Sequence, residues 1–408
     1  MDTYLVGGAV RDSLLDYPVI ERDWVVVGAT PQQMLDQGFQ QVGKDFPVFL
    51  HPKTRDEHAL ARTERKSGHG YHGFEVHCDP GVTLEEDLLR RDLTINAMAK
   101  ASDGSIIDPY GGQQDIQARL LRHVSDAFVE DPLRVLRTAR FAARFHHLGF
   151  SVAPETLALM ADIVAQGELA HLSVERIWVE MDRALGERNP EVFVEVLREC
   201  GALQKLLPEL DALFGVPQTP EHHPEIDSGL HTLMSLQQAV RMDAPRHVRF
   251  AVLVHDLGKG TTPEAEWPRH IAHEKRGVKL VRNVCKRFKA PNHYRDLALA
   301  VCEYHLHSHR ALELRGKTLL KLLRATSGLR QAEKWEFFIM ACEADARGRT
   351  GFEDRDYPQA DYLRRVRAVA LDVSAADFPD LQGPAIGEAI AEEQIRRLEK
   401  LRSENSSD

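Results

Sequence analysis

The sequence has no long apolar run and few cysteines, and both absences narrow the class of protein. No apolar stretch approaches the length of about 18 residues that a transmembrane helix needs. The start MDTYLVGGAVRD has neither the basic end nor the apolar core of a signal peptide, so we expect a cytoplasmic protein that does not act at a membrane. The five cysteines are scattered and form no C-x-x-C pair, which argues against a disulfide framework and against a zinc ribbon.

Two familiar phosphate-binding motifs are also missing. The chain has no G-x-G-x-x-G, and the segment LVHDLGKGT (253–261) fails the P-loop pattern because Leu253 stands where the first glycine belongs. The net charge of −10 argues against binding of nucleic acid over the whole surface. It leaves room for a local basic groove.

The distribution of strand-like and helical patterns predicts an α+β chain. Strand-like pieces occur in the first third, at 3–6, 23–27, 47–51, 74–78 and 105–109. Beyond about residue 113 the apolar residues follow a helical period almost throughout. We therefore predict a small mixed α/β head followed by a helical body, with the proline-rich segment 214–229 as a linker.

Two carboxylates lie at the mouth of an apolar run in ERDWVVVG (21–28). Glu21 and Asp23 would lie on one face of an extended chain, with Cα atoms about 7 Å apart, so both would reach one hard cation such as magnesium. A solvated strand entrance is the alternative for this tripeptide alone.

The segment YLVGGAVRD predicts a strand, a Gly7-Gly8 turn and a helix. Glycines let backbone N–H groups approach an anion, the helix adds its positive end, and Arg11 would point at the same anion. A tight strand-to-helix turn without a ligand is the alternative. Next to Glu21 and Asp23, however, such a loop fits phosphoryl transfer, which needs both a grip on phosphate and a magnesium site.

A second polar segment, LLRRDLTINA (88–97), supplies Arg91, Asp92 and Asn96. These offer a cation for phosphate, a carboxylate that accepts from a ribose hydroxyl, and an amide. A helix start with surface charge would explain them equally well.

An arginine face is predicted on one helix in EDPLRVLRTARFAAR (130–144). Asp131 and Pro132 form a good N-cap and first-turn pair, and arginines then recur at steps of three or four at Arg134, Arg137, Arg140 and Arg144. Like charges on one face repel, so a triphosphate or an RNA backbone would stabilise them. Pairing with acidic residues elsewhere in the chain is the alternative.

The order of these motifs resembles the class II tRNA nucleotidyltransferases, the bacterial CCA-adding enzymes. The resemblance rests on LVGGAVRD, RDWVVVG, RRDLTINAMA, IIDPYGG with Asp115, and EDPLRVLRTARFAARF. It implies a head of the polymerase-beta superfamily, followed by helical neck, body and tail. It also implies the partners tRNA, CTP and ATP, and CCA addition without a nucleic acid template.

The resemblance further implies roles for single residues. Glu21 and Asp23 would hold magnesium, and Asp92 would sense the ribose 2′-hydroxyl. Asp131 and Arg134 would act as a protein template for the base edge, since an aspartate accepts and an arginine donates hydrogen bonds. The other nucleotide-binding residues would be Gly8, Arg11, Arg91, Asn96, Arg137 and Arg140.

One position departs from the family pattern, which has aspartate at both carboxylate positions. Glu21 keeps the charge but is one methylene longer, and magnesium tolerates geometric error poorly. We expect activity to be retained with a modest shift.

The second half carries a histidine and aspartate pattern. His231 in GLHTL and the adjacent His255 and Asp256 offer three ligands for one ion, and Asp345 is the candidate fourth. More histidines follow at His270, His273, His305, His307 and His309. Histidines with structural roles in the core are the alternative.

The pattern resembles the HD phosphohydrolase superfamily, and the whole chain resembles multifunctional enzymes of gamma-proteobacterial type. This implies phosphatase, 2′-nucleotidase and 2′,3′-cyclic phosphodiesterase activities that depend on a transition metal such as nickel. We predict a head at 1–125, a neck and body at 126–220, an HD domain at 226–330 and a helical tail at 331–408, in a monomer or homodimer.

Three other functions fit parts of this pattern. A bacterial poly(A) polymerase shares the head, but Asp45 stands at a position that is basic in those enzymes. A signalling-nucleotide synthetase and hydrolase joins the same two modules in the opposite order. A catalytically inactive RNA-binding scaffold would not need the acid pair.

Overall fold

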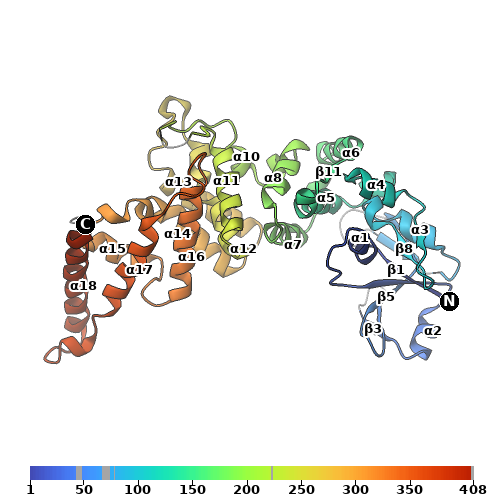
Figure 1. The fold of residues 1–408 in the computed structure, drawn as a ribbon, viewed down its shortest axis with the longest axis horizontal. Helices are drawn as coiled ribbons and strands as arrows, with labels where there is room; N and C mark the ends of the chain where they lie inside the picture. Colours follow the sequence, from blue (N-terminus) through green and yellow to red (C-terminus); the bar gives the residue numbers. More distant parts are fainter. Residues whose placement is uncertain (43–47, 67–73, 78, 222–223, 406–408) are drawn as a thin grey trace. The chain divides into compact units, whose positions relative to one another are not determined.

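The computed structural model describes residues 1–42, 48–66, 74–77, 79–221 and 224–405, so Asp45 lies outside the described residues. The chain divides into two compact units (Figure 1). Unit 1 comprises Met1–Ala184 and Val192–Lys205, and unit 2 comprises Leu185–Glu191 and Leu206–Asp408. None of the helices in the described ranges has both the length and the apolar character needed to cross a membrane.

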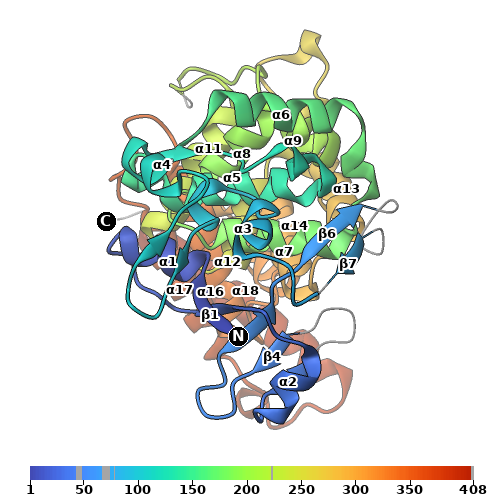
Figure 2. The same ribbon diagram turned by 90° about the vertical axis from the view of Figure 1, so that its right-hand side faces the viewer.

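Unit 1 is built on a mixed sheet of seven strands. In spatial order these are β3 (Gln40–Val42), β4 (Val48–Leu50), β5 (Glu57–Leu60), β2 (Asp23–Val27), β1 (Asp2–Val6), β8 (Ala99–Lys100) and β9 (Ile106–Ile107). Strand β2 runs antiparallel to β1 and parallel to β5. A separate hairpin consists of β6 (Thr63–Lys66) and β7 (Phe74–His77) (Figure 2).

The register of β1 against β2 brings two predicted features to the same edge of the sheet. Val6, the last residue of β1, pairs with Asp23, the first residue of β2. Gly7 therefore follows directly beside Asp23 and turns the chain into α1 (Gly8–Leu14). Gly7 has a positive φ of 66°, and a Cβ there would lie 2.7 Å from Nη1 of Arg91, so only glycine fits.

The expected strands are present, and shorter ones were missed. Each strand-like piece of the sequence contains a strand, although Pro47 and Cys78 at the ends of two pieces lie outside the described residues. Strands β3, β5, β6 and β8 were not predicted because two to four residues show too little alternation. A further pair, β10 (Leu120–Leu121) and β11 (Ser151–Val152), interrupts the region that was expected to be helical.

The arginine-rich helix α5 spans Leu133–Phe145 and has Pro132 as its N-cap. It therefore begins one residue later than the Asp131-Pro132 pattern predicts. Asp131 still satisfies the helix start, because its Oδ1 accepts a hydrogen bond from the backbone N–H of Leu133 (3.1 Å). Val135 and Phe145 on the apolar side of α5 are fully buried.

Within the described residues, seven further helices begin before residue 207. They are α2 (Pro31–Asp36), α3 (Leu84–Leu89), α4 (Gly112–Ala118), α6 (Pro154–Ala165), α7 (Val174–Leu185), α8 (Pro190–Glu199) and α9 (Ala202–Leu206). The sheet core is apolar, with Val6, Val25 and Leu88 in one buried cluster and Met34 and Phe49 in another.

Unit 2 is built mainly of helices, with an isolated β-bridge between Pro217 and Asp227. Its helices are α10 (Pro208–Asp211), α11 (Ser228–Arg241), α12 (Arg246–Val254), α13 (His273–Arg287), α14 (Asn292–His309), α15 (Gly316–Ala325), α16 (Ala332–Arg347), α17 (Pro358–Leu371) and α18 (Pro384–Asn405). Helix α12 packs on α14, and α11 and α14 pack on α16. This packing brings side chains from five helices into contact: α11, α12, α13, α14 and α16. The prediction that 214–229 is a linker is wrong, because its described residues lie inside unit 2, from just after α10 into the first turn of α11.

A close backbone approach fixes the segment after α12 against α13. A short 3-10 helix, η5 (Leu257–Thr261), contains Gly258, and a Cβ there would lie 2.0 Å from the carbonyl oxygen of His273. Gly277 also lies against Gly258. Because both contacts are with backbone atoms, relief requires the elements to move apart.

We predict that Gly258→Ala destabilises unit 2 by about 1–3 kcal/mol, the usual cost of overpacking. The matched control is Gly387→Ala in α18, where a Cβ meets open space. That change should be neutral or stabilising by up to about 1 kcal/mol, because alanine favours helix. Thermal denaturation followed by circular dichroism measures both. Equal midpoints for the two variants would contradict the close approach.

Candidate functional site

A cleft of about 580 Å³ in unit 1 brings together the predicted nucleotide-binding and magnesium-binding residues. Gly8 and Arg11 come from the start of α1, and Asp23 is the first residue of β2. Glu21 lies two residues earlier, outside the strand, and lines the same cleft. The other predicted residues that line it are Arg91, Asp92, Asn96, Asp131, Arg134, Arg137 and Arg140.

The acid pair, Glu21 and Asp23, lies in the cleft beside the positive charge of Arg91. Desolvation raises the pKa of Asp23, and the negative charge of Glu21 raises it further. The guanidinium of Arg91 opposes both effects. Two carboxylates that lie together beside the Gly7-Gly8 turn are suited to a shared divalent cation.

Asp92 is a buried carboxylate of the cleft that binds side chains from two segments. Its Oδ1 accepts from Nδ2 of Asn96 (2.9 Å), and its Oδ2 accepts from Nε and Nη2 of Arg137 (2.8 and 2.7 Å). Burial alone would raise the pKa of Asp92, but the charge of Arg137 and these hydrogen bonds outweigh it, so the pKa falls well below its usual range. Asn96 in turn accepts a hydrogen bond from Arg11.

The arginines of α5 line the cleft, as predicted, and several also pair with acidic residues. Nε of Arg140 donates to Glu180 (2.6 Å), and Nη2 of Arg144 donates to Asp12 (3.2 Å). Arg134 donates to the carbonyl oxygens of Ala127 (2.9 Å) and Arg90 (2.6 Å). Both alternatives considered for this helix thus hold in part, because the face is open to the cleft while much of its charge is balanced.

Sequence reasoning missed the contribution of α7. Nη2 of Arg176 donates to Oδ2 of Asp131 (2.9 Å), and Arg176 and Arg183 line the cleft. Arg176, Glu180 and Arg183 follow a helical spacing in VERIWVEMDR, which is the local pattern that would have placed them on one face.

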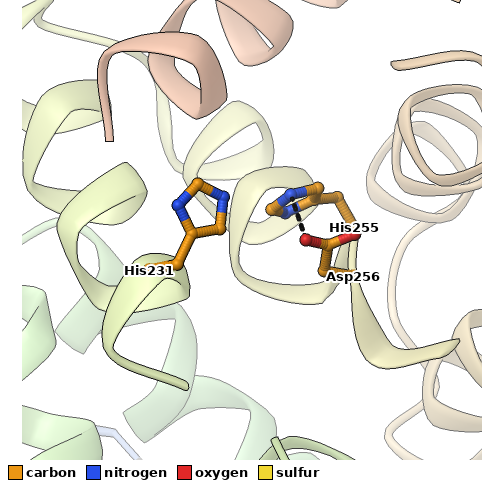
Figure 3. Close-up of side chains that lie close together, drawn as sticks. All are labelled: His231, His255 and Asp256. Carbon is orange, nitrogen blue, oxygen red and sulfur yellow. Dashed lines mark ion pairs between the residues drawn. The ribbon is translucent and has the colours of Figure 1, made fainter. Parts of the chain in front are cut away.

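A buried cluster in unit 2 joins the predicted histidine and aspartate residues (Figure 3). His231 comes from α11, and His255 and Asp256 follow α12. Nε2 of His255 lies 3.2 Å from Oδ2 of Asp256 and 3.5 Å from Oδ1 of Asp345. Oδ1 of Asp345 also lies 3.0 Å from Nε2 of His231, so the candidate fourth ligand on α16 belongs to the same cluster.

Two further histidines complete the cluster. Nε2 of His273 lies 3.1 Å from Oδ1 of Asp256 and 3.3 Å from Nε2 of His305. Both histidines are buried. The sequence indicated them only as later members of the histidine-rich segments, because their helices α13 and α14 had no predicted position relative to α12.

The hydrogen bonds of the imidazole rings fix which nitrogen faces the acids. Nδ1 donates to a backbone carbonyl oxygen in each ring: His231 to Gly348 (2.9 Å), His255 to Val252 (2.7 Å), His273 to His270 (2.9 Å) and His305 to Val301 (3.1 Å). A carbonyl only accepts, so the proton of each neutral ring is on Nδ1, and the lone pair of Nε2 points at the aspartates. Metal-binding histidines are usually held this way.

The charge balance of the cluster fits a bound cation. Burial lowers the pKa of His305 to about 3, so its ring is neutral and able to bind a metal. Burial would also lower the pKa of His255, but Asp256 and Asp345 raise it to about 10, which shows how strongly the two carboxylates attract positive charge. Nε2 of His255 and Oδ1 of Asp256 are buried without a hydrogen-bond partner among the described residues. A metal ion held by these nitrogen and oxygen donors would satisfy both atoms.

Three protein families match successive parts of the chain. The family described as "Poly A polymerase head domain" matches residues 3–122, and "Probable RNA and SrmB- binding site of polymerase A" matches residues 149–214. The family described as "HD domain" matches residues 230–336. The first match contains the glycine turn and the acid pair, and the third contains all of the clustered side chains except Asp345.

Solved structures of CCA-adding enzymes share the fold. A Bacillus stearothermophilus CCA-adding enzyme in complex with CTP is 27% identical with a TM-score of 0.64, covering 96% of this chain and 87% of that one. A Thermotoga maritima CCA-adding enzyme complexed with tRNA is 18% identical with a TM-score of 0.61, covering 100% and 91%. The second likeness concerns the fold alone.

Curated relatives match the chain from end to end. The multifunctional CCA protein of Thioalkalivibrio sulfidiphilus is 62% identical over 99% of this chain and 99% of its own length. The multifunctional CCA protein of Pseudomonas fluorescens is 59% identical over 100% of both. The resemblance drawn from the motifs is confirmed, and this chain belongs to the family of multifunctional CCA proteins.

Proposed function

We propose that the cleft of unit 1 adds CCA to the 3′ end of tRNA from CTP and ATP, and that the cluster of unit 2 hydrolyses phosphate esters. For the first activity, the decisive observation is the cleft in which a glycine turn, an acid pair and an arginine face meet. Solved CCA-adding enzymes of the same fold bind CTP and tRNA. We also propose that the protein is cytoplasmic, that it has the four domains predicted from the sequence, and that it is a monomer or a homodimer.

The nucleotidyl transfer needs the triphosphate to be held in line with the tRNA end. The 3′-oxygen of tRNA forms a bond to the α-phosphorus, the bond from that phosphorus to the bridging oxygen breaks, and pyrophosphate leaves. Magnesium held by Glu21 and Asp23 would supply the charge stabilisation at the transferred phosphate. The N–H groups at Gly8 and the guanidinium groups of Arg11 and Arg91 bind the phosphate oxygens.

Nucleotide selection is assigned to the residues deeper in the cleft. Asp92 accepts a hydrogen bond from the ribose 2′-hydroxyl, in a position held by Asn96 and Arg137. Asp131 and Arg134 present an acceptor and a donor to the base edge. Arg137 and Arg140 add positive charge beside the triphosphate.

The cluster of unit 2 is assigned to phosphatase, 2′-nucleotidase and 2′,3′-cyclic phosphodiesterase activity. A transition metal such as nickel, held by His231, His255, Asp256 and Asp345, would supply a Lewis acid and an activated water. The carbonyl contacts of the histidine Nδ1 atoms keep the rings oriented for that role.

We predict that tRNA transcripts ending at the discriminator base gain C, C and A and no more when incubated with the protein, magnesium, CTP and ATP. Single-nucleotide gel resolution of the labelled products measures this. A long adenosine ladder that does not need CTP would instead indicate poly(A) synthesis. No extension at all would overturn the assignment of the acid pair.

Glu21→Asp is the matched variant in the same assay. Because the glutamate keeps the charge, we expect turnover to change by less than about ten-fold when aspartate is restored. A much larger gain would show that Glu21 holds the metal poorly in this protein.

Arg176→Ala is predicted to weaken nucleotide selection. Without the ion pair, Oδ2 of Asp131 loses its charged partner and the carboxylate is then held through Oδ1 by the N–H of Leu133, so we expect kcat/KM for CTP and ATP to fall by roughly ten-fold. Single-nucleotide addition kinetics measure the change, and Arg176→Lys should restore part of it. Unchanged phosphohydrolase activity in the same preparation controls for folding, and wild-type selection would contradict the role.

His255→Ala is predicted to separate the two activities. The phosphohydrolase activity should fall by roughly a hundred-fold or more, because a buried ligand is lost and its carboxylate partners remain. CCA addition should be unchanged. Hydrolysis of p-nitrophenyl phosphate with nickel, cobalt or magnesium measures the first, and tRNA extension measures the second. His293→Ala on α14 is the control, since His293 is exposed; loss of both activities in His255→Ala would argue against separate sites.

A further inference from the structure

A second cleft in unit 2, with a volume of about 530 Å³, is lined mainly by polar residues. It is formed by the end of α14, the end of α16, the loop that follows α16 and the start of α17. Arg347, Arg349 and Arg355 supply its positive charge, and Asp356 is its one carboxylate. We call this region the arginine cleft.

Two of these arginines have no carboxylate partner within the described ranges. Arg347 pairs with Glu343 (2.7 Å). Nε of Arg349 is buried without a hydrogen-bond partner, and the guanidinium of Arg355 lies 5.0 Å from the ring centre of Phe352. Arg349 and Arg355 are therefore the two arginines of the cleft with no ion pair among the described residues; an anion would stabilise such guanidinium groups, and phosphate matches their geometry.

His309 lines the arginine cleft and connects it to the buried histidine and aspartate cluster of unit 2. Nε2 of His309 lies 2.7 Å from Oδ2 of Asp345, whereas Oδ1 of that carboxylate faces His231. Nδ1 of His309 lies 3.1 Å from the hydroxyl of Tyr357. Gly348, which immediately precedes Arg349, accepts the hydrogen bond from Nδ1 of His231. The loop after α16 therefore contacts the cluster through Gly348, and Tyr357 at the start of α17 contacts it by way of His309.

The position of His309 also separates the two sites. A group bound in the arginine cleft meets His309 and not the donor atoms of the cluster, because His309 occupies the outer oxygen of Asp345. A phosphate held by the arginines is therefore a different phosphate from the one that reacts.

We propose that the arginine cleft is a second phosphate subsite of the HD centre, which recognises a non-reacting phosphate of the substrate. Arg349 and Arg355 bind that phosphate, and the substrate class is a nucleotide or RNA end that carries at least two phosphates. This inference rests on the phosphohydrolase function proposed above. The centre should therefore prefer an RNA end to a nucleoside with one phosphate.

The test compares adenosine 2′,3′-cyclic phosphate with the same compound carrying a 5′-phosphate. In the natural protein we expect kcat/KM to be roughly ten- to a hundred-fold higher for the second compound, as for one or two charge-assisted hydrogen bonds. Arg349→Ala and Arg355→Ala should raise KM for the second compound and leave the first unchanged. The control is Arg396→Ala, an exposed arginine on α18 outside the cleft.

The outcomes distinguish the subsite from the activity. If the natural protein hydrolyses both compounds equally, or if the arginine variants keep the natural preference, the subsite is overturned while the phosphohydrolase function stands. If no phosphate ester is hydrolysed with any divalent metal, the phosphohydrolase function fails instead.

A binding measurement tests whether the subsite exists even if no phosphate ester is hydrolysed. Calorimetry with adenosine 3′,5′-bisphosphate in a chelator should show one binding event fewer in Arg349→Ala, with CTP binding retained. An isotherm identical to that of the natural protein would overturn the subsite.

Discussion

The carboxylate of Asp92 lies buried in unit 1, and its charge is stabilised there because Asn96 and the N–H of Leu93 donate to Oδ1 and Arg137 donates to Oδ2. The contact with Arg137 joins the segment after α3 to the arginine helix α5. The negative charge of Asp92 also balances part of the positive charge on that helix. The ion pairs of Arg140 with Glu180 and of Arg144 with Asp12 do the same. The helix can therefore present guanidinium groups to a ligand without the repulsion that an unpaired row would suffer.

The same constraint operates in unit 2 with a different partner. Asp256 and Asp345 are buried and have several imidazole rings around them, and Oδ2 of Asp256 also pairs with the ammonium group of Lys259 (2.5 Å). A guanidinium carries a permanent charge, whereas an imidazole exchanges its proton for a metal. In the proposed functions, the arginine partners of unit 1 leave a cleft for an anion, and the histidine partners of unit 2 make a centre for a cation.

Most of the candidate site was predictable because its parts are local in sequence. Gly8, Arg11, Glu21 and Asp23 lie within one strand-turn-helix-strand segment, and the arginines of α5 follow a helical period that is visible without a structure. Partners from distant helices were not predictable in the same way. No periodicity relates Arg176 to Asp131, and none relates His273 to His305, because each pair forms only when separate helices pack. Short strands such as β8 were missed for a similar reason, since their sheet partners and not their own residues define them.

In the proposed template pair, Asp131 and Arg134, preorganisation and selectivity would be combined. Asp131 is held by Arg176, and Arg134 donates to the carbonyl oxygens of Ala127 and Arg90. Both groups are thus satisfied before a nucleotide arrives. Under this proposal, a base that enters the cleft would exchange these contacts for its own. A matching edge would replace the hydrogen bonds, while a mismatched edge would leave a charged group without a partner. Because an unsatisfied buried charge costs far more than a hydrogen bond gains, discrimination would come mainly from that penalty.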